Sequence, residues 1–180
     1  SGDGKQYTFY LRQTQWSSGE EITARDFVYS WRRVLDPATG AKYASLMYCI
    51  RGAEAFNRGE ISDFTRVGVR ADGEHRLVVD LREITPHFLE LTSFPTFMAV
   101  PRKTIEKHGR LWIKPGRIVC NGPYELVRWR FNYKFRLRRN PRYWNRSQVK
   151  TGILDIYSVE DVQTGFNIYE TGGADLITSV

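Results

Sequence analysis

The clearest hydrophobic pattern in the chain lies at residues 24–35 and predicts an amphipathic helix. Its apolar residues recur at helical spacing and form one stripe: Phe27, Val28, Trp31, Val34 and Leu35. Thr23 is the predicted N-cap, with Asp26 three residues later in a weaker version of the capping box. Arg32 and Arg33 fall off the stripe. We therefore expect Trp31 to be buried and both arginines to be exposed.

Other patterns up to residue 120 predict a mixture of strands and short helices. Residues 6–12 alternate as a strand does, and "RVGVRADGEHRLVVDL" predicts a hairpin that turns at Asp72-Gly73. Residues 39–60 predict one or two short helices broken near Gly52. "TPHFLELTSF" and "RKTIEKHG" predict two more helices, the second ending at Gly109, and "TFMAVP" predicts a short buried strand.

Residues 124–139, "YELVRWRFNYKFRLRR", alternate apolar and basic side chains over their whole length. A single strand of this length is long for a globular protein, so we expect a hairpin that turns near Asn132. Apolar residues then share one face and basic residues the other. The opposing pairs would be Trp129 with Leu137, Phe131 with Phe135, Arg128 with Arg138, and Arg130 with Arg136. Like charges opposite one another are unfavourable, so the basic face should be open to water or meet an anion.

The last segment predicts a strand at 153–159, a helix at 160–172 and a second strand at 174–178. This order is typical of the start of a parallel α/β unit. The whole chain is therefore predicted to be an α/β protein of mixed α+β type. Both ends give the impression of a cut, because neither starts or stops at a completed element, and we expect a fragment of a longer protein.

The net charge of the chain adds a hypothesis about its partners. The sequence has 27 Lys and Arg residues against 20 Asp and Glu residues, which gives a net charge of +7. Such a balance favours anionic partners. One hypothesis is therefore a basic nucleic-acid or anion-binding module that uses the arginine face of the 124–139 hairpin. The aromatic residues of that hairpin are predicted to lie on the opposite face, where they could not stack on bases beside the arginines. We expect weak anion binding and no specific nucleic-acid partner.

No residue pattern predicts catalysis, a metal centre or a cofactor. His75, His87 and His108 are far apart, and the chain has no HExxH, no CxxC and no phosphate-binding glycine loop. We expect no enzyme activity, no catalytic residue and no metal ligand. Cys49 and Cys120 match no metal motif, and two free thiols are the favoured interpretation. A disulfide between them is the alternative in an oxidising compartment.

Several segments, in order, resemble the extracytoplasmic solute-binding proteins of family 5, the oligopeptide and dipeptide receptors of ATP-binding cassette (ABC) importers. The segments are "WSSGEEITARDFVYSWRRVLDP", "YASLMY", "VGVRADGEHRLVVDL", "PHFLELTSFPTFMAVPRKTIEKHG", "CNGPYELVRW" and "LRRNPRYWN". The turn-capped helix and the "NGPY…RNPRYW" succession are the most specific. The resemblance covers nearly all of residues 6–178.

This resemblance implies the first lobe only of a two-lobe periplasmic-binding-protein type II fold. Residues 1–120 would form a flanking α/β subdomain, and residues 121–180 a partial segment of the central sheet. Such receptors capture peptides outside the cytoplasmic membrane and deliver them to a membrane permease. The implied location is extracytoplasmic, in the periplasm or on the outer face of the membrane, with a lipid anchor left open. A nickel complex or an oligosaccharide remains an alternative ligand for the same fold.

The resemblance implies one ligand-binding residue, Tyr43 in "KYASLMY", at the peptide cleft. The alternative for Tyr43 is a half-buried helix tyrosine with no ligand. Asn121 and Gly122 match a structural turn between subdomains. The chain by itself is expected to bind peptides poorly, because the second lobe would supply most ligand groups. Apolar surface left bare on the hairpin is expected to drive self-association.

Overall fold

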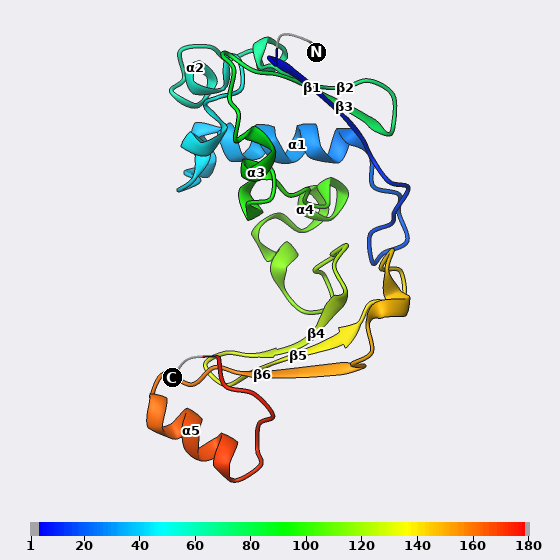
Figure 1. Ribbon diagram of the computed structural model, residues 1–180, viewed down its shortest axis with the longest axis vertical. Helices are drawn as coiled ribbons and strands as arrows, with labels where there is room; N and C mark the ends of the chain where they lie inside the picture. The colour runs from blue at the N-terminus through cyan, green and yellow to red at the C-terminus, as the bar shows by residue number, and fades with distance from the viewer. Residues whose placement is uncertain (1–3, 179–180) are drawn as a thin grey trace.

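The computed structural model describes residues 4–178, which form an elongated molecule with a sheet near each end (Figure 1). The first sheet has the order β1-β3-β2 and the second the order β4-β5-β6, and all their pairings are antiparallel. The strands are β1 (Gln6–Tyr10), β2 (Val69–Ala71), β3 (Arg76–Asp80), β4 (Tyr124–Arg130), β5 (Lys134–Arg139) and β6 (Ile153–Tyr157). The mixed α/β class predicted from the sequence is confirmed.

The α-helices are α1 (Ala24–Leu35), α2 (Ala53–Asn57), α3 (Phe88–Leu91), α4 (Arg102–His108) and α5 (Val162–Glu170). Short 3-10 helices connect them: η1 (Pro37–Thr39), η2 (Ala44–Met47), η3 (Phe64–Arg66), η4 (Pro95–Phe97), η5 (Gly109–Ile113) and η6 (Arg146–Gln148). The helices α1 to α4 and the first sheet form an N-terminal body, whereas α5 lies beyond the second sheet, away from that body (Figure 1).

Helix α1 is the central element of the N-terminal body, as its sequence predicts. Asp26 accepts a hydrogen bond of 2.9 Å from the backbone N–H of Thr23, which is half of the expected capping box. Trp31 is only 2% exposed and Arg32 is exposed. The prediction that Arg33 is exposed is wrong. This residue is half-buried and lies one helical turn from Tyr29.

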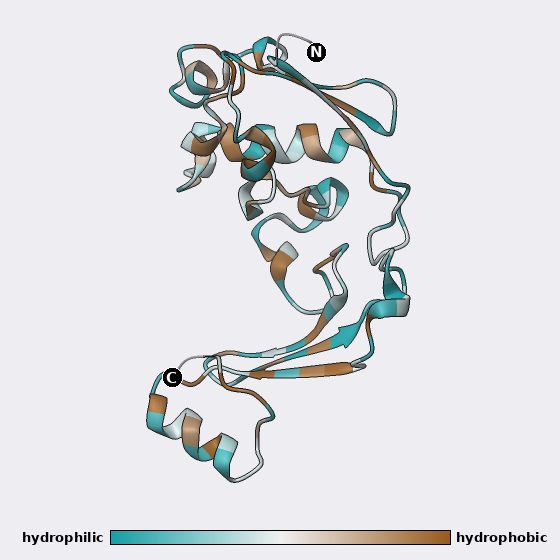
Figure 2. Ribbon diagram, in the orientation of Figure 1, coloured by the Kyte–Doolittle hydropathy of each residue, from teal (hydrophilic) through white to brown (hydrophobic). Residues whose placement is uncertain are grey.

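The core of the N-terminal body lies between α1, the first sheet and the segments from α3 to η4. Figure 2 shows hydrophobic residues along α1 and along β6. The buried cluster consists of Ala24, Trp31, Leu35, Met47, Ile50, Ala53, Phe56, Val67, Val69, Leu77, Val79, Leu81, Phe88 and Phe97. All of its members lie before residue 98, so the second sheet has no comparable core among the described residues.

Two predicted strands are absent from the described chain. The "TFMAVP" segment begins in η4, because Pro95 favours the start of a helical turn and Phe97 packs edge-on against Trp31 at 5.4 Å. Residues 174–178 pair with no strand among the described residues. Strand β6 pairs antiparallel with β5, so the expected parallel unit is not formed here.

The hairpin at 124–139 turns at Asn132 as predicted, but its register is wrong by two residues. Trp129 faces Phe135, and Arg130 faces Lys134. The loop centres on Asn132 because that residue adopts the left-handed conformation (φ 49°), which asparagine tolerates, and the Tyr133 N–H donates to the Arg130 carbonyl oxygen. An irregularity in the pairing around Val127 then shifts the remaining pairs by one. Apolar and basic side chains of the strands still occupy opposite faces.

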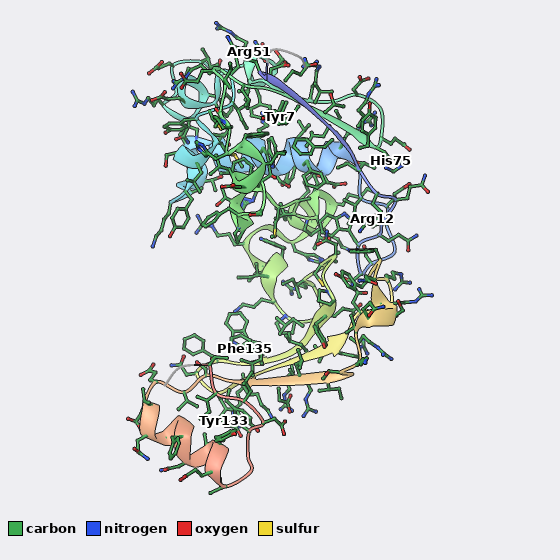
Figure 3. The ribbon with its side chains drawn as sticks, viewed as in Figure 1. Tyr7, Arg12, Arg51, His75, Tyr133 and Phe135 are labelled. Atoms are coloured by element: carbon green, nitrogen blue, oxygen red, sulfur yellow. The ribbon has the colours of Figure 1, made fainter. Side chains whose placement is uncertain are left out.

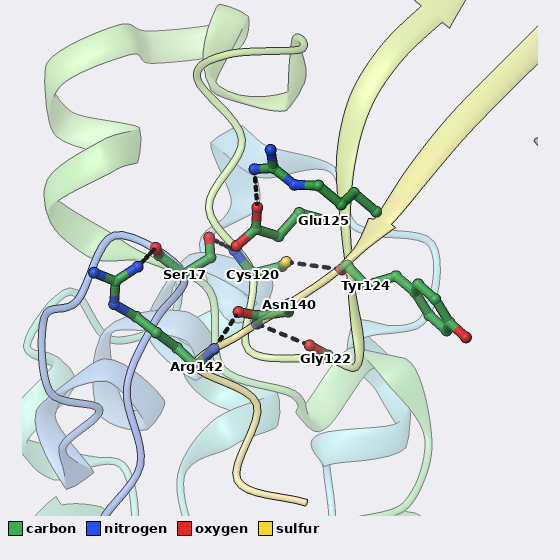
Figure 4. A network of polar contacts seen from close by, with 8 residues as sticks. Ser17, Cys120, Gly122, Tyr124, Glu125, Asn140 and Arg142 are labelled. Carbon is green, nitrogen blue, oxygen red and sulfur yellow. Dashed lines mark hydrogen bonds and ion pairs between the residues drawn. The ribbon is translucent and has the colours of Figure 1, made fainter. Parts of the chain in front are cut away.

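A network of polar contacts joins the N-terminal body to the second sheet (Figure 4). Ser17 and Cys120 exchange backbone and side-chain hydrogen bonds, with the Ser17 N–H donating to the Cys120 carbonyl oxygen at 2.7 Å. Asn140 is fully buried, and its side chain donates to the Gly122 carbonyl oxygen at 2.9 Å. Its Oδ1 accepts from the backbone N–H of Arg142 at 2.9 Å. These contacts fit the structural role expected for the turn that contains Gly122.

Candidate functional site

Tyr43 lies immediately before η2, with its ring on the surface of the N-terminal body. The residue is 55% exposed and precedes η2 rather than lying inside it. Its ring meets that of Phe94 edge-on, with centroids 5.3 Å apart. No hydrogen bond to the Tyr43 hydroxyl occurs among the described residues, which leaves this group available to a ligand.

Buried residues anchor the two segments that carry the rings of Tyr43 and Phe94. Ala44 and Met47 anchor η2 in the core, while Phe88 and Phe97 anchor the segment on either side of Phe94. Leu89 and Met98, from the same segment, are each 55% exposed. The Tyr43 edge, defined as Tyr43 and Phe94, therefore offers apolar contact area between segments that are anchored in the core. Aromatic rings in such an edge combine a large contact area with a polar hydroxyl.

A second aromatic group, half-buried along the strands and exposed at the tip, lies on the apolar face of the β4–β5 hairpin. Trp129 stacks on Phe135 at 5.6 Å, and the Lys114 ammonium lies 4.6 Å from the centre of the Trp129 ring. Figure 3 places Phe135 on the side of the sheet that faces the N-terminal body and Tyr133 on the side of α5. Phe131 at the hairpin tip is 76% exposed. The expected bare apolar surface is thus present in the described chain.

The basic face of the second sheet carries its own counter-charges. Asp155 accepts two hydrogen bonds of 2.7 Å from Arg136 and a third of 3.2 Å from Lys134. Arg138 pairs with Glu125 at 3.1 Å. The hydrogen bond from Arg136 is the main reason that the pKa of Asp155 lies well below its usual range. Sequence patterns do not reveal this partner, because β6 lies beside β5 only in the fold.

These pairings weaken the nucleic-acid hypothesis. Arg128 and Arg130 are the two cations of this face without an ion pair among the described residues, and Arg130 lies over the ring of Tyr133. These two arginines line a hollow of about 170 Å³ together with Tyr133, Lys134 and Arg136. Tyr133 lies on the basic side with Tyr157, contrary to expectation, because it belongs to the turn rather than to a strand. Two unpaired arginines can contact few phosphates, whereas proteins that bind a phosphate backbone make many such contacts.

A hollow of about 550 Å³ lies away from Tyr43, between α1 and the β2 edge. Its cations are already engaged: Arg51 and Arg70 pair with Asp80, and Arg32 lies over the ring of Phe64. The lining residues are Val28, Arg32, Arg51, Ser62, Asp63, Phe64, Thr65, Val67, Val69, Arg70 and Ala71. The carboxylate of the lining, Asp63, accepts hydrogen bonds from Thr65, so the hollow offers a ligand no unengaged charged group among the described residues.

The two cysteines form no disulfide and are half-buried free thiols. Burial raises the pKa of both Cys49 and Cys120, so the thiolate needed for nucleophilic chemistry is disfavoured. Cys120 donates to the carbonyl oxygen of Tyr124 within the junction network. Among the described helices, none combines the length and the apolar composition that crossing a membrane requires.

Comparison with known proteins places this geometry in context. Residues 1–180 match the family described as bacterial extracellular solute-binding proteins, family 5 Middle. The periplasmic oligopeptide-binding protein OppA of Escherichia coli (strain K12) is 38% identical over 177 residues, covering 97% of this chain and 32% of that protein. The probable deoxycholate-binding periplasmic protein YgiS of the same strain is 36% identical, covering 96% of this chain and 33% of that protein.

A solved structure agrees with these sequence relatives. The crystal structure of Haemophilus influenzae OppA in complex with the peptide RPPGFSPFR superposes with a TM-score of 0.92 at 34% sequence identity. The superposition covers 97% of this chain and 34% of that one. The chain therefore spans about a third of the length of the relatives that it matches.

Proposed function

Because this chain belongs to the bacterial extracellular solute-binding proteins of family 5, we propose that it forms part of a receptor that captures peptides outside the cytoplasmic membrane. The receptor delivers them to the permease of an ABC importer. One observation supports this proposal above the others: the described chain superposes closely on a receptor solved with a bound peptide. Solute capture of this kind involves no covalent chemistry, which fits the protonated thiols of the described chain.

Within this proposal, the chain supplies part of the first lobe. Residues 1–120 act as the flanking subdomain and residues 121–180 as part of the central sheet, joined by the network around Asn140. The buried junction holds the two parts in a fixed relation, as a lobe that closes over a ligand requires.

Tyr43 is the proposed ligand residue. Receptors for varied peptides read the main chain, which every peptide shares, and leave side chains in wide hydrated pockets. An exposed hydroxyl on a rigid ring suits this task, because it can donate to or accept from a peptide group while the ring packs against the chain. The edge contact with Phe94 fixes the position of the ring before a ligand arrives.

A chimera tests this function. The chain would replace the matching third of E. coli OppA, and calorimetry would measure binding of a pool of tri- to pentapeptides, with deoxycholate as the competing ligand. We expect the chimera to bind peptide and not deoxycholate. Tyr43→Ala should weaken binding about tenfold, or ~1.4 kcal/mol, while Tyr43→Phe should show how much of that loss belongs to the hydroxyl. A chimera that melts cooperatively but binds no peptide would contradict the proposal.

The 180-residue chain alone provides the complementary measurement. One lobe leaves a peptide half exposed, and each immobilised side chain costs roughly 0.5–1.5 kcal/mol of ordering. We therefore expect no binding at micromolar peptide concentrations. Micromolar binding by the chain alone would show that the main ligand groups lie within these residues, contrary to the proposed division of labour.

A further inference from the structure

Three side chains that are well separated in the sequence converge at one edge of the N-terminal body. Glu21 precedes α1, whereas Glu74 and His75 lie in the turn between β2 and β3. One ligand-type atom from each of the three lies within 4.8 Å of the other two. Figure 3 shows His75 at the outer edge of this body, near the end of the β2–β3 hairpin.

The backbone holds this convergence in place. The N–H of Ala24, at the start of α1, donates to the Glu74 carbonyl oxygen at 2.7 Å, and the N–H of Leu11 donates to that of His75 at 2.7 Å. Glu21 itself lies in an isolated antiparallel bridge with Gln15. The three side chains therefore start from positions that are fixed by main-chain hydrogen bonds rather than from a loose loop.

The imidazole of His75 is incompletely satisfied. Its Nε2 lies 3.2 Å from a carboxylate oxygen of Glu21, while its Nδ1 is buried without a hydrogen-bond partner among the described residues. Buried polar atoms without a partner are uncommon in folded proteins. The contact between Nε2 and the Glu21 oxygen requires a proton between the two atoms, and a metal ion that binds Nε2 displaces this proton.

The neighbouring charges leave this cluster unneutralised. Glu20 pairs with Lys103 and Asp72 pairs with Arg76, so both adjacent carboxylates have cationic partners. Among the described residues, Glu74 makes no ion pair and Glu21 pairs with His75 alone. Two carboxylates beside one imidazole present a local negative charge that a divalent cation would balance.

The distances suit a tetrahedral metal. Two ligands that each lie about 2.1 Å from a tetrahedral zinc ion are about 3.4 Å apart. The observed separation between the His75 Nε2 and the Glu21 oxygen, 3.2 Å, is close to that value. Glu74 is exposed and can make up the remaining distance by a change of side-chain rotamer.

We propose that Glu21, Glu74 and His75 form a binding site for a divalent transition-metal cation, with Zn²⁺ as the expected ion. Mixed imidazole and carboxylate ligands suit this ion, and water completes its coordination. The bound ion ties the β2–β3 hairpin to the segment that precedes α1, so binding stabilises the folded N-terminal body. The site is independent of the proposed peptide receptor function and uses none of its residues.

Calorimetric titration of the metal-free chain with zinc chloride tests the site. We expect one equivalent of Zn²⁺ to bind with a dissociation constant below about 100 µM, and the melting temperature to rise with added zinc. Glu74→Gln and His75→Gln should each weaken binding at least tenfold. Glu60→Gln, at an exposed position, and His108→Gln, at a half-buried position elsewhere, serve as matched controls and should bind zinc as the unaltered chain does.

Two readouts separate the site from adventitious binding. Zinc should be released on lowering the pH from about 7.5 to about 5.5, because metal-bound imidazole must be deprotonated. Glu74→Gln should lose the zinc-dependent rise in melting temperature while keeping its circular dichroism spectrum. Binding weaker than about 100 µM overturns the proposal. Equal affinity in the Glu74→Gln variant, or loss of binding in His108→Gln, also overturns it.

Discussion

The indole N–H of Trp31 donates a hydrogen bond of 2.9 Å to the carbonyl oxygen of Phe97, 66 positions further along the chain. The two rings also meet edge-on, with an interplanar angle of 87°. A single side chain of α1 thus fixes η4 through packing and through a directional bond. The exposed ring of Phe94 belongs to the residue before η4, so the position of the Tyr43 edge depends on this contact.

Replacing Trp31 should therefore be among the most destabilising changes in the N-terminal body. Trp31→Ala should lower the free energy of unfolding by about 3–5 kcal/mol, as for other buried large aromatics. Trp31→Phe keeps a ring but leaves the Phe97 carbonyl without its donor, which costs about 1–3 kcal/mol in addition to any lost packing. Urea denaturation measures both, and the exposed Arg32→Ala is the control, expected within ~0.5 kcal/mol of the unaltered chain.

The sequence predicts what local patterns determine. Helix α1, its cap at Thr23, the end of α4 at Gly109 and the turn at Asn132 all follow from residues within a few positions. The strand register does not follow, because the left-handed conformation of Asn132 and the irregularity near Val127 decide it. The η4 helix depends on the contact with Trp31, which no local window contains.

The candidate sites also depend partly on local sequence and partly on contacts that form only in the fold. Tyr43 is predicted through a family resemblance, and its ligand role stays a prediction, but its exposure and its contact with Phe94 are visible only in the fold. The pairing of Arg136 with Asp155 and the convergence of His75 on Glu21 bring together residues from separate elements. Alternation and spacing carry no information about such contacts.

Asn140 offers a test of the junction between the two sheets. Asn140→Ala removes the donor to the Gly122 carbonyl oxygen and the acceptor of the Arg142 N–H, both at 2.9 Å (Figure 4). The unfolding free energy should fall by about 1–3 kcal/mol, because buried backbone groups lose their partners. Hydrogen exchange should show faster exchange of the Arg142 amide, while the β1–β3 amides keep their protection. Unchanged exchange at Arg142 would contradict this role.

Stability should depend on acid pH through Asp155. Hydrogen bonds from Arg136 and Lys134 lower the pKa of this carboxyl in the folded chain, so the unfolded chain takes up the proton first. The contribution is therefore present above the unfolded pKa of about 3.9 and is lost as the pH falls through the lower, folded pKa. Urea midpoints measured from about pH 7 down to about pH 3 should fall.

The Asp155→Asn variant isolates this carboxyl from the others. At neutral pH it should be less stable than the unaltered chain, because Arg136 then faces Arg128, and Lys134 faces Arg130, without the counter-charge. The difference between the two proteins should shrink as the pH falls, since acid removes the same charge. A difference that stays constant over this range would show that the ion pairs contribute nothing. Glu60→Gln, at an exposed position, is the control.

The apolar face of the second sheet should make the chain self-associate. Phe131 is 76% exposed and Ile156 is 49% exposed, and a continuous exposed apolar face favours contact with another copy. Sedimentation velocity should show an apparent mass that rises with protein concentration and with added sulfate, which strengthens apolar contacts and screens charged ones.

Two variants locate the contact between copies. Phe131→Ser combined with Ile156→Ser should reduce the rise in apparent mass. Tyr10→Ser, which removes an equally exposed ring (80%) from the first sheet, should leave it unchanged. A strict monomer at every concentration would contradict the prediction, and equal effects of both variants would locate the contact elsewhere.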